Sequence, residues 1–453
     1  MSDDPDSAGG GNSDEGQAWR LDPQRSRTSA DASMMTSSTP TSASSNRSAS
    51  PTSGPQDPDI LDDAGVSECL GESFANALDL KTWNEGFGDI AQMMDRTARE
   101  VEDARRFETE VQKHVRTTIF PWLRTSNRQG APTDAGVWVA PLDEIARFQR
   151  GVLFNGQAEA CDGSIQVFET LALTIVQIAV AKVSYETDGG TWSHRLYWRD
   201  LRVKKLEDIG ARLGELLQIR RSGEGSARQG GRQKNPGKVS ELLRRGMMAY
   251  AERAVLLNES TAEWRIGHGN IAPYELLTGS GSMELLCAGL DVLTNLVLDH
   301  QRFLFVPSDP SGGDLLTLGH ALHPLEYAIV NTGEQQMFRI VSTGKYAPEF
   351  KERALKFVKE AGPKIVAGVY RASAYGPPHI FYAHEDWVHD AATLAIADSR
   401  IQEHRSFPML IDLADGVCGA TFDGTSFRSA IETTYSEKGV PYEFLRERDT
   451  RTQ

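Results

Sequence analysis

A mixed α/β fold, with one sheet flanked by helices and preceded by a disordered tail, is the architecture that the sequence predicts. Short apolar runs rich in β-branched residues alternate with longer amphipathic segments in the C-terminal two thirds of the chain. The first 70 residues contain little apolar sequence. The length of 453 residues allows one large domain or two to three average ones, and no internal repeat is evident.

The N-terminal tail, residues 1–69, is rich in Ser, Thr, Asp, Gly and Pro. The first 70 residues carry twelve acidic residues against four arginines, and so hold most of the net charge of −15. We predict that this segment is disordered and that residues 70–450 form the folded domain. The start of the chain lacks a basic stretch followed by an apolar core, and no window approaches eighteen apolar residues, so we expect a cytoplasmic protein with no membrane span.

The four cysteines are far apart in the sequence and form no CxxC pair. This spacing argues against a structural zinc site or a disulfide framework, so we expect reduced cysteines that serve in packing. They are Cys69, Cys161, Cys287 and Cys418.

The first predicted element is a long amphipathic helix at residues 88–122. Its apolar residues recur every three or four positions, from Ile90 and Met94 to Val111 and Val115, and Pro121 is expected to stop it. The apolar stripe favours a helix that packs on the core, and a dimerisation or partner helix is the alternative.

A β-hairpin is predicted next, with β-branched residues in 171–185, a Thr-Asp-Gly-Gly turn and alternating residues in 191–198. Residues 220–238 are basic and Gly-rich, which predicts a mobile loop. Ser240 then has the position of an N-cap for the following helix. The later predicted elements are helices at 283–298, 349–361 and 387–402, and strands at 302–306, 327–331, 363–371 and 379–384.

The first candidate for chemistry is the tripeptide Asp162-Gly163-Ser164 ahead of the hairpin. Such a tripeptide is a turn in most proteins. Next to a strand, however, the carboxylate can hold a divalent cation, and the glycine lets a phosphate backbone approach.

The second candidate combines Glu252, on the predicted helix, with the Gly-rich segment 264–282. This segment contains His268, Asn270 and Glu275, more potential ligands than a connection needs, although it is equally explained as a loop with a capped helix. Its GSGS stretch resembles a phosphate-binding turn, but no GK[ST] follows, so it is not a P-loop.

The third candidate is the pair His384 and Glu385, at the end of a predicted apolar strand. Neighbouring strand residues point to opposite faces, so these two side chains are not expected to share a metal. The chain also lacks the HExxH motif of metalloproteases and the GxSxG elbow of serine hydrolases.

The order of these motifs resembles the NurA family of DNA-end-processing nucleases. Asp162 matches the opening catalytic aspartate of the family and Glu252 matches its helical glutamate. Residues 366–385 are similar to its two paired strands, and residues 406–415 are similar to its C-terminal motif. The resemblance implies an RNase H-like (Piwi-like) fold, manganese or magnesium as cofactor, DNA as substrate, a homodimer and a HerA-like hexameric ATPase as partner.

The sequence departs from the family pattern at three places. Thr278 stands where an aspartate is usual, so Glu275 is expected to supply a carboxylate; Pro307 replaces a lysine, and Asp415 replaces a histidine. The resemblance then implies a catalytic and metal-binding set of Asp162, Glu252 and Glu275, with Asp415 as a further catalytic residue.

DNA phosphates are expected to contact the basic loop. The candidate residues are Arg220, Arg221, Arg228, Arg232, Lys234 and Lys238. Two other functions stay open: a catalytically degenerate protein of the same fold that serves as a structural partner of an ATPase or of DNA ends, and an unrelated α/β hydrolase-like enzyme.

Overall fold

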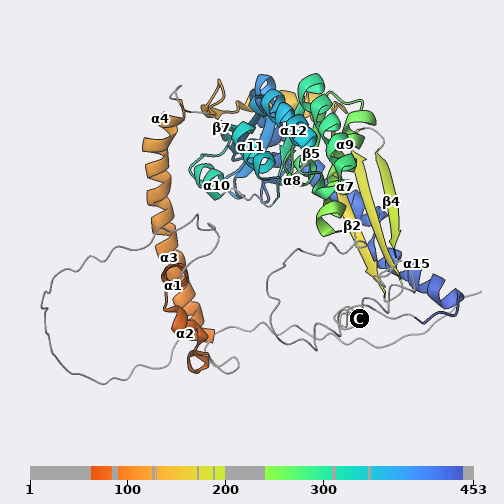
Figure 1. Cartoon of the computed structure of the whole chain (residues 1–453). Helices are drawn as coiled ribbons and strands as arrows, with labels where there is room; N and C mark the ends of the chain where they lie inside the picture. The colour runs from red at the N-terminus through yellow and green to blue at the C-terminus, as the bar shows by residue number, and fades with distance from the viewer. Residues whose placement is uncertain are drawn as a thin grey trace, which may run out of the picture. The chain divides into compact units, whose positions relative to one another are not determined.

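The structure, a computed structural model, describes residues 63–83, 90–124, 128, 130–170, 173–186, 189–198, 240–308, 313–344 and 348–441 (Figure 1). The chain divides into two compact units, Met1–Asp89 and Ile90–Gln453. The described part of the first unit holds helices α1 (Asp63–Leu70) and α2 (Phe74–Leu78) and a 3₁₀ turn, η1 (Leu80–Thr82). Helix α1 therefore begins inside the segment that the composition predicted to be disordered.

The second unit is built on one nine-stranded mixed sheet with the order β1-β7-β8-β9-β6-β5-β2-β3-β4. Strands β2, β5 and β6 are parallel neighbours, and all other pairs are antiparallel. The strands are β1 (Gly136–Val139), β2 (Ala158–Glu169), β3 (Thr174–Val183), β4 (Gly190–Trp198), β5 (Trp264–His268), β6 (Phe303–Val306), β7 (Glu326–Thr332), β8 (Ile365–Tyr370) and β9 (His379–His384). A mixed α/β architecture is thus confirmed.

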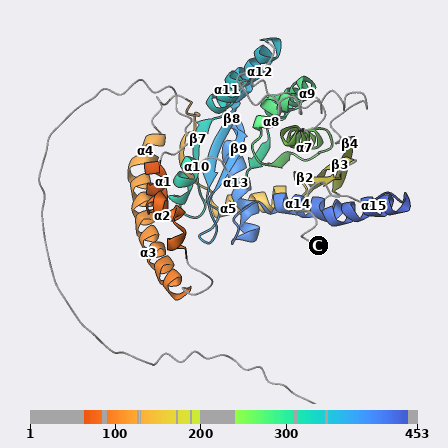
Figure 2. The same ribbon diagram turned by 60° about the horizontal axis from the view of Figure 1, so that its bottom comes forward.

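Helices cover both faces of this sheet (Figure 2). One apolar core lies between the strands and helices α7 (Glu241–Asn258), α9 (Met283–Thr294), α11 (Glu334–Thr343) and α12 (Pro348–Ala361). A second lies on the opposite face, against α5 (Leu142–Phe148), α13 (Val388–Ser399) and α14 (Met409–Thr421). The remaining helices are α8 (Tyr274–Leu277), α10 (Gly313–His320) and α15 (Gly424–Glu437). In the described residues no helix is both long enough and apolar enough to cross a membrane.

The predicted long helix is present but interrupted. Helix α3 (Ile90–His114) continues through a π-helical turn (Val115–Ile119) into α4 (Phe120–Leu123). Pro121 was expected to stop the helix, but it stands in the first turn of α4, where a missing N–H is tolerated. Val115 is buried against β7 and β8, whereas every residue of α3 lies outside the buried core.

The predicted hairpin, the helix capped by Ser240 and the later helices and strands are all confirmed, with ends shifted by up to a few residues. Strands β1, β2 and β5 were not predicted, and neither were helices α5, α8, α10, α11, α14 and α15. Asp162-Gly163-Ser164 lies inside β2 rather than ahead of a hairpin, and the segment 264–282, expected as a loop, opens with β5 and contains α8. Both strands contain glycines, and these mask the alternation that identifies a strand.

The prediction of reduced packing cysteines is confirmed for the three cysteines whose side chains are described. Cys161 and Cys418 are buried, Cys287 is half-buried, and all three are free.

Candidate active site

Asp162 lies within β2, where it is 5% exposed. It is paired with Ala181 of β3, and the preceding residue, Cys161, is paired with Gly267 of the parallel strand β5. Its Oδ1 atom accepts a hydrogen bond of 2.8 Å from the backbone N–H of Gly163. The sheet therefore holds this carboxylate at a fixed place between two neighbouring strands.

Glycine is required at position 163 because the glutamate of α7 approaches the strand there. A side-chain carbon at Gly163 would lie 2.8 Å from Glu252 Oε1 and 2.8 Å from Met248 Cγ. On the other side of β2, the next residue, Ser164, accepts a 3.5 Å hydrogen bond from Cys418 of α14. Since successive strand residues alternate between faces, Asp162 leaves β2 on the α14 side and Glu252 approaches on the α7 side.

His268, the last residue of β5, contacts Asp162. Its Nδ1 atom lies 3.3 Å from Asp162 Oδ1, and its Nε2 atom lies 2.8 Å from Ser308 Oγ. Burial lowers the pKa of His268, but the hydrogen bond to Asp162 and the negative charges of Asp162, Glu252 and Asp415 outweigh it and raise that pKa above its ordinary value. The sequence analysis noted His268 only as one ligand in a loop, and the end of β5 beside β2 is what places it in the site.

Asp415, on the exposed side of α14, joins the same group of charges. Partial burial and then the negative charge of Asp162 raise its pKa, while His268 lowers it. The carboxylate predicted at this position is therefore close enough to Asp162 for the two charges to interact, on the face from which Asp162 projects.

Glu252 is buried and bound to its neighbour, Arg253, with 3.0 Å between Oε2 and Nη1. Burial raises the pKa of Glu252 to about 7; Arg253 opposes this and the charge of Asp162 adds to it. Arg253 also donates to the backbone carbonyls of Ala249, Asn270 and Ile271. The arginine thus fixes Glu252 and ties α7 to the segment that follows β5.

Glu275, expected to complete the carboxylate set, is placed differently. It lies on α8, and its Oε1 atom is 2.7 Å from Nη2 of Arg245 on α7. Asp162 is within electrostatic reach of both Glu252 and Asp415, which lie on opposite sides of β2, whereas Glu275 is paired with an arginine.

A divalent cation fits part of this set. In the described ranges, no three His, Cys, Asp or Glu side chains are placed to hold a metal ion. Asp162 and Asp415 nevertheless offer hard oxygen donors whose mutual repulsion a cation would relieve. Mg²⁺ is usually bound by one or two carboxylates, with phosphate and water oxygens as its other ligands. The donor chemistry therefore fits a cation that binds together with a phosphate-bearing substrate.

The other sequence candidates do not add to the site. Thr278 Oγ1 accepts a hydrogen bond from the backbone N–H of Ser280, and Ser282 Oγ accepts one from the backbone N–H of Leu285 in α9. The hydroxyl groups of this segment therefore cap helical turns. His384 is buried, and Glu385 is bound to Lys364. The basic residues of 220–238 lie outside the described residues, and Pro307 connects β6 to Ser308.

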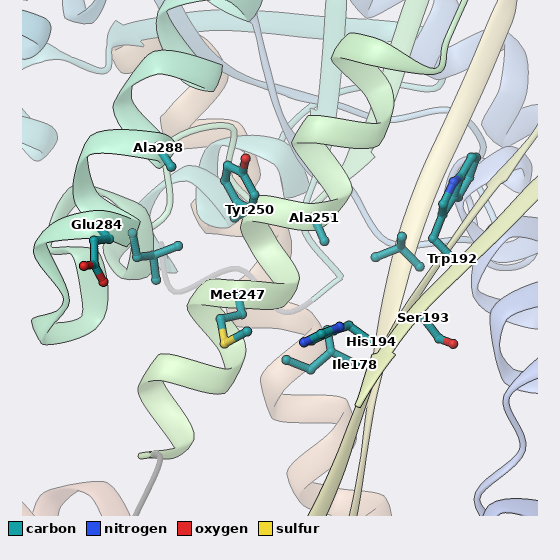
Figure 3. A pocket seen from close by; sticks show the side chains of 11 residues that line it. Ile178, Trp192, Ser193, His194, Met247, Tyr250, Ala251, Glu284 and Ala288 are labelled. Atoms are coloured by element: carbon teal, nitrogen blue, oxygen red, sulfur yellow. The ribbon is translucent and has the colours of Figure 1, made fainter. Parts of the chain in front are cut away.

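An apolar groove of about 470 Å³ lies beside the site on the α7 face of the sheet (Figure 3). Met247 and Tyr250 of α7 line it together with Ile178 and Trp192 of the hairpin. Gly163, Val180 and Trp192 occupy one register row across β2, β3 and β4; Val180 and Trp192 line the groove, which therefore lies over β3 and β4, next to Gly163. None of the four predicted carboxylates lines the groove, and we do not place the chemistry there.

The raised pKa of Glu252 predicts how stability depends on pH. A carboxyl group whose pKa is higher in the folded state, here about 7 against 4.5, binds protons more readily when folded. Its favourable contribution is full below pH 4.5 and is lost as the pH rises through 7. We expect urea unfolding to show that wild type loses stability relative to Glu252→Gln over this range. Asp398→Asn tests the same reasoning elsewhere: burial raises the pKa of Asp398 from 3.8 to about 6, so wild type should also lose stability relative to this variant as the pH rises through 6. A difference between wild type and Glu252→Gln that does not change with pH would contradict the assignment.

Fold and site together define a mixed α/β protein with carboxylates gathered around a central strand. No protein-family profile matches the chain, and no curated protein matches it. Among solved structures, the chain is similar to the NurA nuclease from Sulfolobus solfataricus, with 9% identity and a TM-score of 0.43 over 78% of this chain and 98% of that one. A structure of NurA with manganese is 9% identical, with a TM-score of 0.37 over 69% of this chain and 97% of that one. A structure of NurA bound to dAMP and manganese is 8% identical, with a TM-score of 0.34 over 72% and 92%. These identities and scores are too low to assign the chain to a family.

Proposed function

We propose that this protein is a divalent-metal-dependent DNA nuclease, a divergent relative of NurA with an RNase H-like arrangement of its central strands. The observation that carries the proposal is the position of Asp162 in β2 between Glu252 on one face and Asp415 on the other: burial raises the pKa values of Glu252 and Asp415, and the charge of Asp162 raises each of them further. The order of motifs in the sequence supports it independently. Carboxylates crowded in this way suit the binding of a cation and of a phosphodiester.

When bound, Mn²⁺ or Mg²⁺ would supply charge neutralisation at the phosphate and activation of a water molecule. Asp162 and Asp415 would hold the cation from the α14 face. Glu252, fixed by Arg253, is on the opposite side of β2, where its carboxylate lies against Gly163. His268 would orient the Asp162 carboxylate through its 3.3 Å contact.

The test of this proposal is cleavage of end-labelled single-stranded and duplex DNA by the purified protein. We expect cleavage with Mn²⁺ and none in EDTA. Equal cleavage in EDTA would reject metal dependence. An absence of cleavage of both substrates with Mn²⁺ and with Mg²⁺ would reject the nuclease activity.

A catalytically degenerate protein is the alternative, and one observation favours it. Two of the four predicted carboxylates are already bound by arginines, Glu252 by Arg253 and Glu275 by Arg245. Such a protein would bind DNA ends or an ATPase without cutting, and the same assay would show binding without cleavage.

DNA binding through the basic loop is a further part of the proposal. We expect that replacing the six basic residues at 220, 221, 228, 232, 234 and 238 by Ser weakens DNA binding if they contact phosphates. Each lost contact should then lower the slope of log affinity against log salt concentration by about one. Fluorescence anisotropy at several salt concentrations measures that slope. An unchanged slope would remove the loop from the DNA interface.

For partners, we propose a homodimer that receives duplex DNA from a HerA-like hexameric ATPase. The chain has no Walker A motif, so ATP-driven translocation has to come from another protein. Helix α3 presents exposed apolar residues, among them Met94, Val101 and Phe107, to such a contact. Co-elution with the cognate ATPase in size exclusion is expected; separate elution at micromolar concentration, with duplex degradation that needs no ATP, would contradict the partnership.

A further inference from the structure

A second cavity, of about 410 Å³, lies on the α14 face of the hairpin, between strands β3 and β4 and helix α15. We call it the α15 groove. Helices α14 and α15 follow one another along this hairpin (Figure 2). The lining combines aromatic rings, an arginine, an amide and hydroxyl groups, supplied by Tyr197, Phe427, Arg195, Gln177, Ser426 and Thr434. The α15 groove is therefore more polar than the apolar groove on the opposite face of the sheet.

The α15 groove is on the face of the hairpin from which Asp162 projects. Every second residue of a strand shares a face, so Gln166 and Phe168 of β2 project to the same side as Asp162. Phe168 packs with Ile431 of α15, and a side-chain carbon at Gly424, the first residue of α15, would lie 2.7 Å from Gln166 Oε1. The carboxylates and the groove therefore lie along one face of the same strands.

The strand register gives the separation between the carboxylates and the groove. Asp162 and Gln166 are four residues apart on β2, and Gln166, Gln177 and Arg195 form one row across β2, β3 and β4. With the usual spacings along and between strands, the backbone of Arg195 lies about 16 Å from that of Asp162. An extended DNA strand covers this distance with a few nucleotides, so one strand can occupy both places at once.

The guanidinium of Arg195 is held by a buried amide. Its Nε atom donates a 2.8 Å hydrogen bond to Oε1 of Gln177, which is only 2% exposed, whereas Arg195 itself is exposed. This bond fixes the plane of the guanidinium and leaves its two terminal nitrogens for a ligand. Those nitrogens match a pair of phosphate oxygens. Asp423 also lines the groove, but its Oδ2 atom caps α15 by accepting a 2.8 Å hydrogen bond from the backbone N–H of Ser426.

Tyr197 gives the groove an exposed aromatic surface. The residue is 62% exposed, and its partner across the strands, Ile175, is buried beneath α15. An unpaired base can stack on such a ring whatever its identity, whereas the bases of a duplex are already stacked on one another. An aromatic ring two residues from an exposed arginine on one strand is the combination with which proteins hold single strands.

We propose that the α15 groove binds unpaired nucleotides of a DNA strand, with Tyr197 as the ring on which a base stacks and Arg195 as the contact to a phosphate. The inference rests on the proposed function for the identity of the strand, and it adds the place where that strand is held beyond the carboxylates. Arg195 and Tyr197 are positioning residues, since both are remote from Asp162. The groove would select single-stranded over duplex DNA, because only an unpaired base can lie on Tyr197.

The test is fluorescence anisotropy of the full-length protein with a labelled oligothymidylate of about twelve nucleotides, in EDTA so that no metal-dependent cleavage takes place. Tyr197→Ala should bind at least about fivefold more weakly than wild type, and Tyr197→Phe, which keeps the ring, should bind like wild type. Arg195→Gln should lower the slope of log affinity against log salt concentration by about 0.7, whereas Tyr197→Ala should leave that slope unchanged. Tyr274→Ala is the matched control, since Tyr274 is 52% exposed on α8, which packs on the other face of the sheet.

A duplex of the same length should bind equally to wild type and Tyr197→Ala, because its bases are paired. The inference would be overturned by equal weakening on duplex and single strand, by wild-type affinity of Tyr197→Ala for the oligothymidylate, or by a wild type that does not bind it. Cleavage with Mn²⁺, measured on the same preparations, keeps the two proposals distinct. Binding that depends on Tyr197 without any cleavage would reject the nuclease alone, whereas cleavage with unchanged binding in Tyr197→Ala would reject the groove alone.

Discussion

Replacing Asp162 with Asn is expected to reduce Mn²⁺-dependent DNA cleavage by about a hundredfold or more. A metal ligand of this kind is worth several kcal/mol of transition-state stabilisation, and about 3 kcal/mol corresponds to a hundredfold in rate. Asparagine retains an oxygen that can accept from the Gly163 backbone, so the local strand geometry should persist. Single-turnover cleavage of labelled DNA measures the effect.

The same substitution should leave the fold intact. The charge of Asp162 raises the pKa values of Glu252 and Asp415, so its removal relieves repulsion. The matched control is Asp143→Asn, an exposed acid in the first turn of α5, which should cut DNA like wild type. Full activity in a folded Asp162→Asn protein would remove this residue from the mechanism.

The largest expected effect on stability comes from Arg253. This side chain is fully buried, its guanidinium bonds Glu252 and three backbone carbonyls, and it lies over the Phe305 ring at 5.0 Å. Arg253→Met would leave those acceptors and a buried carboxylate without a partner, which typically costs about 3–5 kcal/mol. Urea unfolding at pH 8 measures the loss.

The direction of the pH effect provides a second check. Without the arginine, the pKa of Glu252 rises further, so at pH 5 the carboxyl is protonated and neutral, and the variant should recover part of its stability there. Arg106→Met is the control, since this arginine and its partner Asp103 on α3 are 75% and 68% exposed, and such a pair should contribute at most about 1 kcal/mol. Similar losses for both variants would contradict the role given to Arg253.

Much of the fold could be predicted because its periodicity is local. The hairpin strands, the helix after Ser240 and the helices at 349–361 and 387–402 each contain their own apolar pattern. Strands β2 and β5 were missed because Gly163 and Gly267 interrupt the alternation of apolar and polar residues. Glycine occurs at these two positions because side chains from other elements fill the space beside the backbone. Glu252 occupies the space at Gly163, and the Phe305 ring would lie 2.1 Å from a side-chain carbon at Gly267.

The site was predictable only in part, for the same reason. The motif order selected Asp162, Glu252 and Asp415. Nothing local to His268 shows that β5 pairs with β2 in parallel, and that pairing is what brings the imidazole to Asp162. Conversely, Glu275 was assigned because it lies close in the sequence to Thr278, which replaces the aspartate of the family pattern. In the structure its carboxylate is instead paired with Arg245 of helix α7.

Binding of Mn²⁺ in the presence of a DNA strand tests the central claim most directly. Electron paramagnetic resonance measures free Mn²⁺ as wild type, Asp162→Asn and Asp143→Asn are titrated with and without single-stranded DNA. The account predicts that DNA strengthens Mn²⁺ binding to wild type and to Asp143→Asn, and that Asp162→Asn loses this DNA-dependent binding. Equal Mn²⁺ binding by wild type and Asp162→Asn would contradict the claim that Asp162 holds the cation of a nuclease site.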